Sequence, residues 1–489
     1  MKLLKKIPFF LLLLVLFFCL HGWVENFGFI GYREVFKPGL IIFTCMVLFT
    51  GVVFLFTKNL LQASLIIFFI SLWYLFFGAF YDWAKEVPYL SFLKSYPVIV
   101  ALLFLFTTGW IIFLKKQPQL QKKLAVYLNL LLFIYIVVDL FSLVNWSEPE
   151  FSGRQTNAVS FDKSKITAKP NVYLLVFDGY PGATSLKDSF NFRNDSLYSY
   201  FAAKDLNVLP VFSNYDLTYF SMSSMFSMHY VEQDFNPMQI TQHDFQRRGV
   251  EIKKASIFPL FKSMGYKIRN LSIFEIADHP PISDKNSFLL AHSILLTDKI
   301  LHNRLNRDVG DRLTAVLPFW KKNDFYQHDT DNKRTEQLLL KTAAEKKEQP
   351  TFIYTHFMMP HGPYYYDSLG NKNPYNKISH HSMWSDKELF ISYLKYVNSR
   401  LTVMTDEIIR NDPQAIIMVM GDHGFRSYSK KKNVIPPLFD NLCAVRFPNK
   451  QHVSIKERWS TVNLFRYVLN CEFGQNIPYL ADSSIVLRY

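Results

Sequence analysis

Three apolar segments of the chain end in side chains that bind metals or move protons. Asp178 closes NVYLLVFD, the pair Asp422 and His423 closes AIIMVMGDH, and His361 lies just beyond TFIYTHFM in MMPHGPYY. Nearly continuous apolar segments are typical of strands buried on both faces, and ligands of such sheets bind beyond the carboxyl ends of the strands. Two carboxylates and an imidazole gathered there suit zinc or manganese, with one position left for a substrate or nucleophile. A single strand-end aspartate is equally suited to a turn or helix cap, so the prediction depends on the combination.

An α/β domain is needed to bring these motifs together. The clearest predicted strands are residues 171–178, 351–358 and 415–422, with weaker candidates at 207–212 and 266–273. Apolar residues recur at helical spacing over 386–409 and again over 461–469, which predicts amphipathic helices there. Short apolar runs alternating with amphipathic ones indicate a mostly parallel sheet covered on both faces. We therefore expect one α/β domain over residues 171–489.

The first 145 residues have the pattern of a membrane region rather than of an α/β domain. Apolar runs occupy residues 7–24, 39–57, 60–81, 97–114 and 124–144, each near the roughly 20 residues that cross a bilayer as a helix. Three lysines precede the first run, Lys58 stands in the turn after the second, and four lysines flank the connection between the fourth and fifth. The positive-inside rule therefore predicts a cytoplasmic N-terminus and residues beyond 145 outside. A cleaved signal peptide over residues 1–22 is the alternative, but no small-residue cleavage site follows it. The expected domains are 1–145, a Ser-, Pro-, Lys- and Asn-containing linker at 146–170, and 171–489.

Composition narrows the classes of protein further. The 489 residues carry 54 Lys and Arg against 40 Asp and Glu, a net charge of +14, and 49% are hydrophobic, which excludes a disordered chain. Four cysteines without a CxxC pair exclude a disulfide scaffold. The visible clusters of positive charge flank the predicted spans, where anionic lipid attracts them, so we expect no nucleic-acid partner. The oligomeric state is left open.

The motifs, taken in chain order, resemble the alkaline phosphatase and sulfatase superfamily. The order is a strand ending in Asp178, the hydroxyl-rich stretch SNYDLTYFSMSSMFSM, then PHGP and GDHG. Five spans followed by an outer catalytic domain resemble the lipoteichoic acid synthase and lipid A phosphoethanolamine transferase branches of that superfamily. The resemblance implies a three-layer α/β fold, a divalent metal, and a bacterial inner-membrane or plasma-membrane protein whose catalytic domain is periplasmic or extracellular.

The resemblance also implies a metal site and a nucleophile. The metal ligands that it implies are Asp178, Asp422, His423 and the nucleophile. Thr218 stands nine residues before Ser227, the distance that separates the sulfatase nucleophile from the threonine of its LLTG motif, so Thr218 is the predicted nucleophile. Ser221 is the second candidate, and Thr218 by itself would also suit a helix N-cap. Metal coordination would lower the pKa of the hydroxyl and let it attack phosphorus.

Substrate contacts are implied for three more residues. His361 matches the imidazole that meets the transferred phosphate or the leaving oxygen, by charge stabilisation or proton donation. Arg426 and Asn214 are further predicted phosphate contacts. His356, five residues before His361 on a strand, is predicted to face the opposite side of the sheet and to be structural.

Departures from the family pattern limit the function. No cysteine or CxPSR-like motif lies between 171 and 442, which disfavours ordinary sulfate-ester hydrolysis. Two-metal relatives carry Asp four residues before the histidine of PHGP, and here that position is Phe357, so one divalent metal, zinc or manganese, is predicted.

The leading hypothesis is a membrane-bound phosphotransferase of phosphoethanolamine or phosphoglycerol type, working through a covalent phospho-threonine. Its expected partners are a membrane phospholipid donor and an envelope glycan or lipid acceptor. Two alternatives stay open: a sulfatase-like or phosphodiesterase hydrolase of the same superfamily, and a non-catalytic member that binds a glycan or partner.

Overall fold

The chain divides into two compact units. The computed structural model describes residues 8–144, 161–282, 296–316, 325–378, 386–426, 436–449 and 459–488, except 27–29, 31, 88, 90–92, 94, 232–234, 273 and 278. One unit comprises Met1–Glu150 and Asp284–Lys322, and the other comprises Phe151–Ser283 and Asn323–Tyr489. Most of the predicted linker at 146–170 lies outside the described residues. The single domain predicted over 171–489 is interrupted, because residues 284–322 group with the N-terminal unit.

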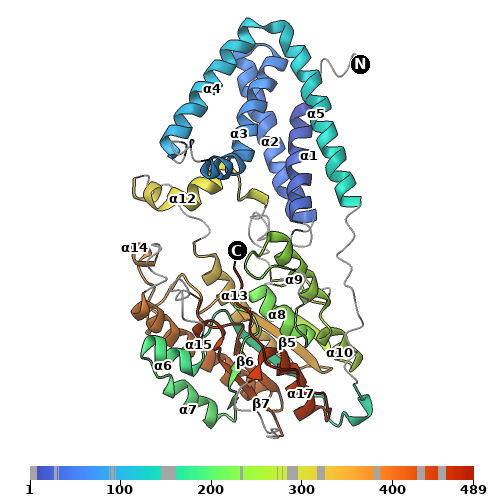
Figure 1. Cartoon of the computed structure of the whole chain (residues 1–489), viewed down its shortest axis with the longest axis vertical. Helices are drawn as coiled ribbons and strands as arrows, with labels where there is room; N and C mark the ends of the chain where they lie inside the picture. The colour runs from blue at the N-terminus through green and yellow to red at the C-terminus, as the bar shows by residue number, and fades with distance from the viewer. Residues whose placement is uncertain are drawn as a thin grey trace. The chain divides into compact units, whose positions relative to one another are not determined.

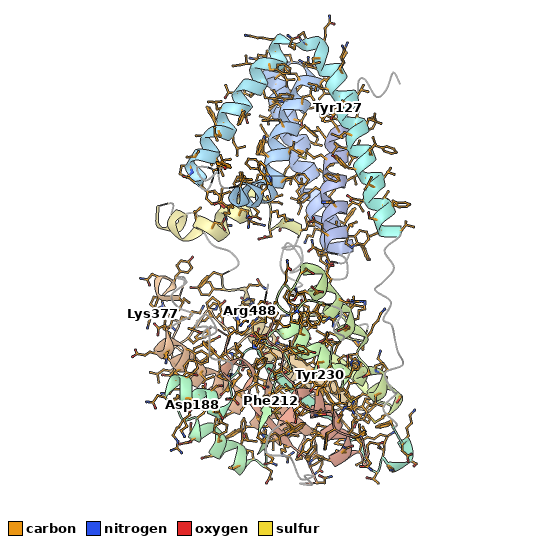
Figure 2. The ribbon with its side chains drawn as sticks, viewed as in Figure 1. Tyr127, Asp188, Phe212, Tyr230, Lys377 and Arg488 are labelled. Carbon is orange, nitrogen blue, oxygen red and sulfur yellow. The ribbon has the colours of Figure 1, made fainter. Side chains whose placement is uncertain are left out.

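Five apolar helices form the N-terminal unit (Figure 1). They are α1 (Phe9–Glu25), α2 (Tyr32–Thr57), α3 (Leu60–Glu86), α4 (Tyr96–Lys116) and α5 (Pro118–Val144). The last four are long and apolar enough to cross a membrane, while α1 is a shorter apolar helix of 17 residues. Many of their side chains project outward around the helices, among them Tyr127 on α5 (Figure 2). These helices mark the chain as an integral membrane protein.

A chain of charged groups ties α5 to α1. Asp139 of α5 is 7% exposed, and its Oδ1 lies 3.2 Å from Nδ1 of His21. Nε2 of His21 lies 3.5 Å from Glu25, whose carboxylate is 3.4 Å from Nζ of Lys299. A carboxylate inside a spanning helix is costly unless it is paired, and here a neighbouring helix supplies the partner.

The inserted segment carries α12 (Leu301–Val316), an amphipathic helix that packs on the membrane helices. Leu301, Leu305 and Val309, one helical turn apart, pack against the apolar cluster formed by the C-terminal end of α3 and the N-terminal end of α4. Buried Arg304 forms an ion pair with Asp82 of α3. The segment joins this unit because its apolar stripe needs a surface to cover it, and the helix ends provide that surface.

The second unit is built on a six-stranded sheet in the order β2-β7-β6-β1-β5-β4. The four parallel strands are β6 (Ile416–Gly421), β1 (Val172–Phe177), β5 (Thr351–Phe357) and β4 (Lys267–Leu271). At one edge β7 (Cys443–Arg446) pairs antiparallel with β6, and β2 (Asn207–Val208) pairs antiparallel with β7. Strand β3 (Val211–Phe212) pairs separately with β8 (Trp459–Ser460). The mostly parallel α/β fold predicted from the sequence is confirmed, and the three strongest predicted strands form its centre.

Helices cover both faces of this sheet and make three layers. One face packs against α8 (Thr218–Ser227), α9 (Gln242–Lys254), α10 (Ile257–Ser263) and α17 (Leu464–Glu472). The other face packs against α6 (Ala183–Phe190), α7 (Asp195–Ala203), α13 (Gln327–Ala344) and α15 (Lys387–Asn411). The remaining short elements are α14 (Tyr375–Ile378), α16 (Pro436–Phe439), η2 (Lys163–Lys165) and η4 (Thr461–Asn463). Cys443 and Cys471 are buried in the core of the first face and form no disulfide.

Docking of the inserted segment predicts a stability effect at Gly78 of α3. A Cβ at this position would lie 2.7 Å from the Cα of Lys299, whose carbonyl accepts a hydrogen bond from the Gly78 N–H. We expect Gly78→Ala to lower the thermal unfolding temperature in detergent and to speed hydrogen exchange over 296–316, although alanine favours a helix by about 1 kcal/mol. The matched control is Gly51→Ala, because a Cβ there meets nothing within 4 Å. Equal behaviour of the two variants would contradict the docking.

Candidate metal centre

The three central strands end at the same level, and this alignment brings two carboxylates together. Phe177 of β1 pairs with Phe357 of β5 and with Gly421 of β6, so Asp178 and Asp422 each stand one residue beyond the sheet edge. Both are buried, at 3% and 0% exposure. Gly179, at φ +67°, turns the chain so that its N–H donates to Oδ1 of Asp422 at 2.8 Å. A left-handed conformation of this kind favours glycine.

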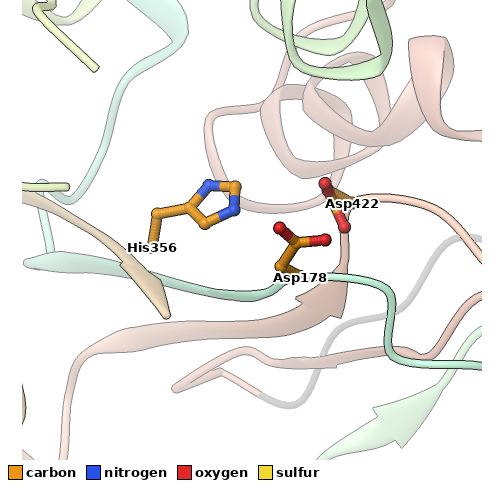
Figure 3. A group of neighbouring side chains, drawn as sticks. All are labelled: Asp178, His356 and Asp422. Carbon is orange, nitrogen blue, oxygen red and sulfur yellow. The ribbon is translucent and has the colours of Figure 1, made fainter. Parts of the chain in front are cut away.

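His356 of β5 joins this pair, and the prediction that it faces away is wrong. His356 pairs with Val176 of β1, and side chains alternate along a strand, so His356 and Asp178 lie on the same face of the sheet. Ligand atoms of His356, Asp178 and Asp422 lie within 4.8 Å of one another, with the imidazole pointing toward both carboxylates (Figure 3). The face of His356 does not follow from its distance to His361, because His361 lies beyond the end of β5, where side chains no longer alternate between the two faces.

His423 adds a second imidazole. Its Nε2 lies 3.4 Å from Oδ2 of Asp422 and 3.6 Å from Oδ1 of Asp178. Its Nδ1 is 2.7 Å from the carbonyl oxygen of Gly424. Because a carbonyl only accepts hydrogen bonds, Nδ1 carries the proton and Nε2 presents its lone pair to the carboxylates. Histidine ligands of metals are commonly oriented in this way by a carbonyl group.

Thr218 opens α8 beside these ligands, as predicted for the nucleophile. Its Oγ1 lies 3.3 Å from Nε2 of His423. Ser221, the second candidate, is 1% exposed, and its hydroxyl donates to the backbone carbonyl of Asp422 at 2.5 Å. Ser221 therefore holds the end of β6 in place, and Thr218 is the hydroxyl directed at the predicted metal ligands.

Charge at this centre is unbalanced without a cation. Oδ1 of Asp178 and Oδ2 of Asp422 are buried and, among the described residues, have no hydrogen-bond partner. Burial and the neighbouring carboxylate of Asp422 raise the pKa of Asp178 well above its usual range. Burial lowers the pKa of His356 to about 4 and also lowers that of His423, so both imidazoles favour the neutral form that binds metals. Two carboxylates and two neutral imidazoles therefore fit a divalent cation.

A small cavity of about 40 Å³ adjoins the centre. His361 and Arg426 line it together with His423, Gly179 and Tyr364. Burial and the charge of Arg426 lower the pKa of His361 to about 4, which makes its imidazole neutral at pH 7. Its Nδ1 lies 2.9 Å from the carbonyl of Gly362 and so carries the proton. The cavity thus brings the two sequence-predicted substrate residues His361 and Arg426 to the metal centre.

Asn214 does not belong to this site, contrary to the prediction. It is fully buried, its amide donates to the carbonyl of Ser483, and its Oδ1 accepts from Thr461 and from the N–H of Val462. These bonds connect the segment before α8 to the C-terminal part of the chain. An asparagine near a hydroxyl-rich helix start carries no sequence signal that separates this structural role from phosphate binding.

His356 generates a test of the metal centre. We expect His356→Gln to lower the affinity for zinc or manganese, measured by titration calorimetry on the full chain, by at least about 10-fold, because a buried nitrogen ligand is lost. The unfolding temperature of the metal-free variant should stay near that of the parent protein. If the metal affinity is unchanged and the unfolding temperature falls, His356 has a purely structural role. Tyr354→Phe removes only the hydroxyl 2.9 Å from Nδ1 of His356, so it should lower the affinity less than His356→Gln does.

Comparison with known proteins places this geometry in a family. The sulfatase family matches residues 193–469. The C-terminal periplasmic domain of EcEptC from Escherichia coli is similar at 11% identity over 64% of this chain and 85% of that chain, with a TM-score of 0.39, and its complex with Zn has a TM-score of 0.41 at 10% identity with the same coverage. The phosphonate monoester hydrolase of Agrobacterium radiobacter shares 12% identity over 64% of this chain and 76% of that chain, with a TM-score of 0.37.

These structural likenesses are distant, and no curated protein matches the sequence. The family match covers more than half of the chain and contains the predicted nucleophile and three of the four clustered metal-binding side chains. The chain is therefore a membrane-anchored member of the sulfatase family.

Proposed function

We propose that this protein is a metal-dependent phosphotransferase that moves a phosphorylated head group from a membrane phospholipid to an envelope glycan or lipid through a phospho-threonine at Thr218. Sulfatase-family enzymes include hydrolases and transferases, so the choice between them depends on this chain's own residues. The main observation in favour of the proposal is the contact of the Thr218 hydroxyl with His423. At the same centre two buried carboxylate oxygens have no hydrogen-bond partner among the described residues and could bind a cation.

Asp178, His356, Asp422 and His423 are the residues that would hold the metal. A bound zinc or manganese supplies positive charge that lowers the pKa of a nearby hydroxyl and stabilises charge on phosphate oxygens. The two imidazoles contribute by staying neutral, and the Gly179 and His423 N–H groups contribute by fixing Oδ1 of Asp422.

In the first step Thr218 Oγ1 attacks the phosphorus of the head-group phosphodiester. The bond from phosphorus to the diacylglycerol oxygen breaks, and the released diacylglycerol oxygen takes up the proton that the Thr218 hydroxyl gives up. The N-terminus of α8, at which Thr218 stands, favours the anionic group that arrives there. Arg426, on the wall of the adjoining cavity, would contact the phosphate oxygens.

In the second step an acceptor hydroxyl attacks the phospho-threonine. Neutral His361, whose Nδ1 donates to the carbonyl of Gly362, would take the hydroxyl proton at Nε2. The bond from Thr218 Oγ1 to phosphorus then breaks, and Oγ1 is protonated again. Its neutral state favours this base role over the charge stabilisation or proton donation expected from the sequence.

The membrane helices support a lipid donor and a definite orientation. The inserted segment 296–316, which follows the first part of the catalytic unit in the chain, packs on the C-terminal ends of α1 and α3. Lys58, between α2 and α3, and the lysines around the connection of α4 to α5 lie at the opposite ends of these helices. Lysines on one side and the inserted segment on the other agree with a cytoplasmic N-terminus and a catalytic unit outside the cytoplasm.

Thr218 provides the test of the covalent step. After incubation with phospholipid vesicles and the metal, we expect mass spectrometry to find a head-group phosphate on Thr218 of the full chain. Thr218→Ala should lose the adduct and reduce turnover by about 10³-fold or more, whereas Thr218→Ser should keep a detectable adduct. An adduct on Ser221, or transfer that survives in Thr218→Ala, would contradict the proposal. Release of free head-group phosphate with no transfer would identify a hydrolase instead.

A further inference from the structure

The membrane unit contains an apolar groove between α1 and α2. Its volume is about 370 Å³, within the roughly 300–1,000 Å³ of small-molecule sites. The walls are large apolar side chains that remain exposed in the protein, namely Leu12 and Leu16 on α1 and Phe36 and Leu40 on α2. Val15 and Val35, buried to 4% and 7% exposure, form part of the floor.

Gly39 lets the two helices approach beneath this groove. A Cβ at Gly39 would lie 2.7 Å from Sγ of Cys19, so any larger residue would push α1 and α2 apart or fill the floor. The groove is thus a defined depression with a close-packed base, and differs from the outward surface of α4, where Phe104 and Leu105 stand exposed.

The dimensions of the groove match one leaflet of a bilayer. Along α1 it runs from Leu12 to Trp23, which is 11 residues and about 16 Å at roughly 1.5 Å per residue. The hydrocarbon core is about 30 Å thick, so the groove covers about half of it. Trp23 and Tyr32 line the end where α1 finishes and α2 begins, and aromatic side chains of this kind favour the membrane interface.

We propose that this groove binds one acyl chain of the phospholipid donor, with the head group at the end marked by Trp23 and Tyr32. The surrounding medium at this depth is hydrocarbon, so an apolar chain one leaflet long is the occupant that fits the lining and the length. The inference rests on the proposed function, since the donor named there is a lipid. The inserted segment, whose Leu296 contacts Gly22 of α1, lies at this same end of the helix.

Photo-crosslinking tests the groove directly. The probe is phosphatidylethanolamine with a diazirine in the middle of one acyl chain, present as a minor component in phosphatidylglycerol vesicles that hold the full chain. We expect peptides of α1 and α2 that line the groove to be labelled several-fold more than the exposed face of α4. Leu16→Trp should abolish this enrichment by filling the groove, and Leu105→Trp is the matched control on α4. Equal labelling of groove and α4 in the parent protein would overturn the proposal as contact with bulk lipid only.

A second measurement separates this proposal from the proposed function. The Thr218 adduct is measured with the long-chain donor and with a donor bearing two short acyl chains. We expect Leu16→Trp to raise the KM for the long-chain donor several-fold and to raise that for the short-chain donor less, whereas Leu105→Trp should leave both reactions unchanged. An adduct on Thr218 without enriched labelling of the groove would overturn only the proposal that the groove binds the acyl chain. Groove labelling without any adduct on Thr218 would overturn the phosphotransferase and leave a lipid-binding site.

Discussion

The unit built on the six-stranded sheet is organised around two buried carboxylates, Asp178 and Asp422, that lie side by side. Removing one carboxylate from water costs several kcal/mol unless it is paired, and Asp178 and Asp422 repel each other in addition. Neutral His356 and His423 add ligands but no charge. A divalent cation would satisfy all four groups, so an arrangement that is unfavourable without a metal would become a strong binding site for one.

The fold holds this arrangement through alignment of strands. Pairing of β1 with both β5 and β6 brings the two aspartates to one edge, and the hydroxyl of Ser221 ties the end of β6 to α8. Because α8 begins at Thr218, this hydrogen bond also fixes the proposed nucleophile beside the proposed metal ligands. Within the membrane unit, polar contacts hold the inserted segment 296–316 on the apolar helices, namely the ion pair of Arg304 with Asp82 and the hydrogen bond from the N–H of Gly78 to the carbonyl of Lys299.

The features that depend on local sequence pattern could be predicted from the sequence. Apolar runs predicted the five helices and the three central strands, and the strand-end positions of Asp178, Asp422 and His423 predicted the centre. Features that depend on strand register or on tertiary contacts could not be predicted from the sequence. The face of the sheet on which His356 lies depends on its pairing with Val176. The structural role of Asn214 depends on partners such as Ser483, which are far away in the chain. The insertion of 284–322 into the membrane unit depends on the surface of α3, which no local pattern reports.

X-ray absorption at the metal edge of the purified full chain tests the central claim most directly. We expect about one zinc or manganese per chain, bound by oxygen and nitrogen with scattering from two imidazole rings, and with zinc-to-nitrogen distances of about 2.0–2.1 Å. The contribution of one ring should disappear in His356→Gln. Protein that stays metal-free in excess zinc and manganese, or metal held without imidazole, would show that these four side chains do not form the metal site.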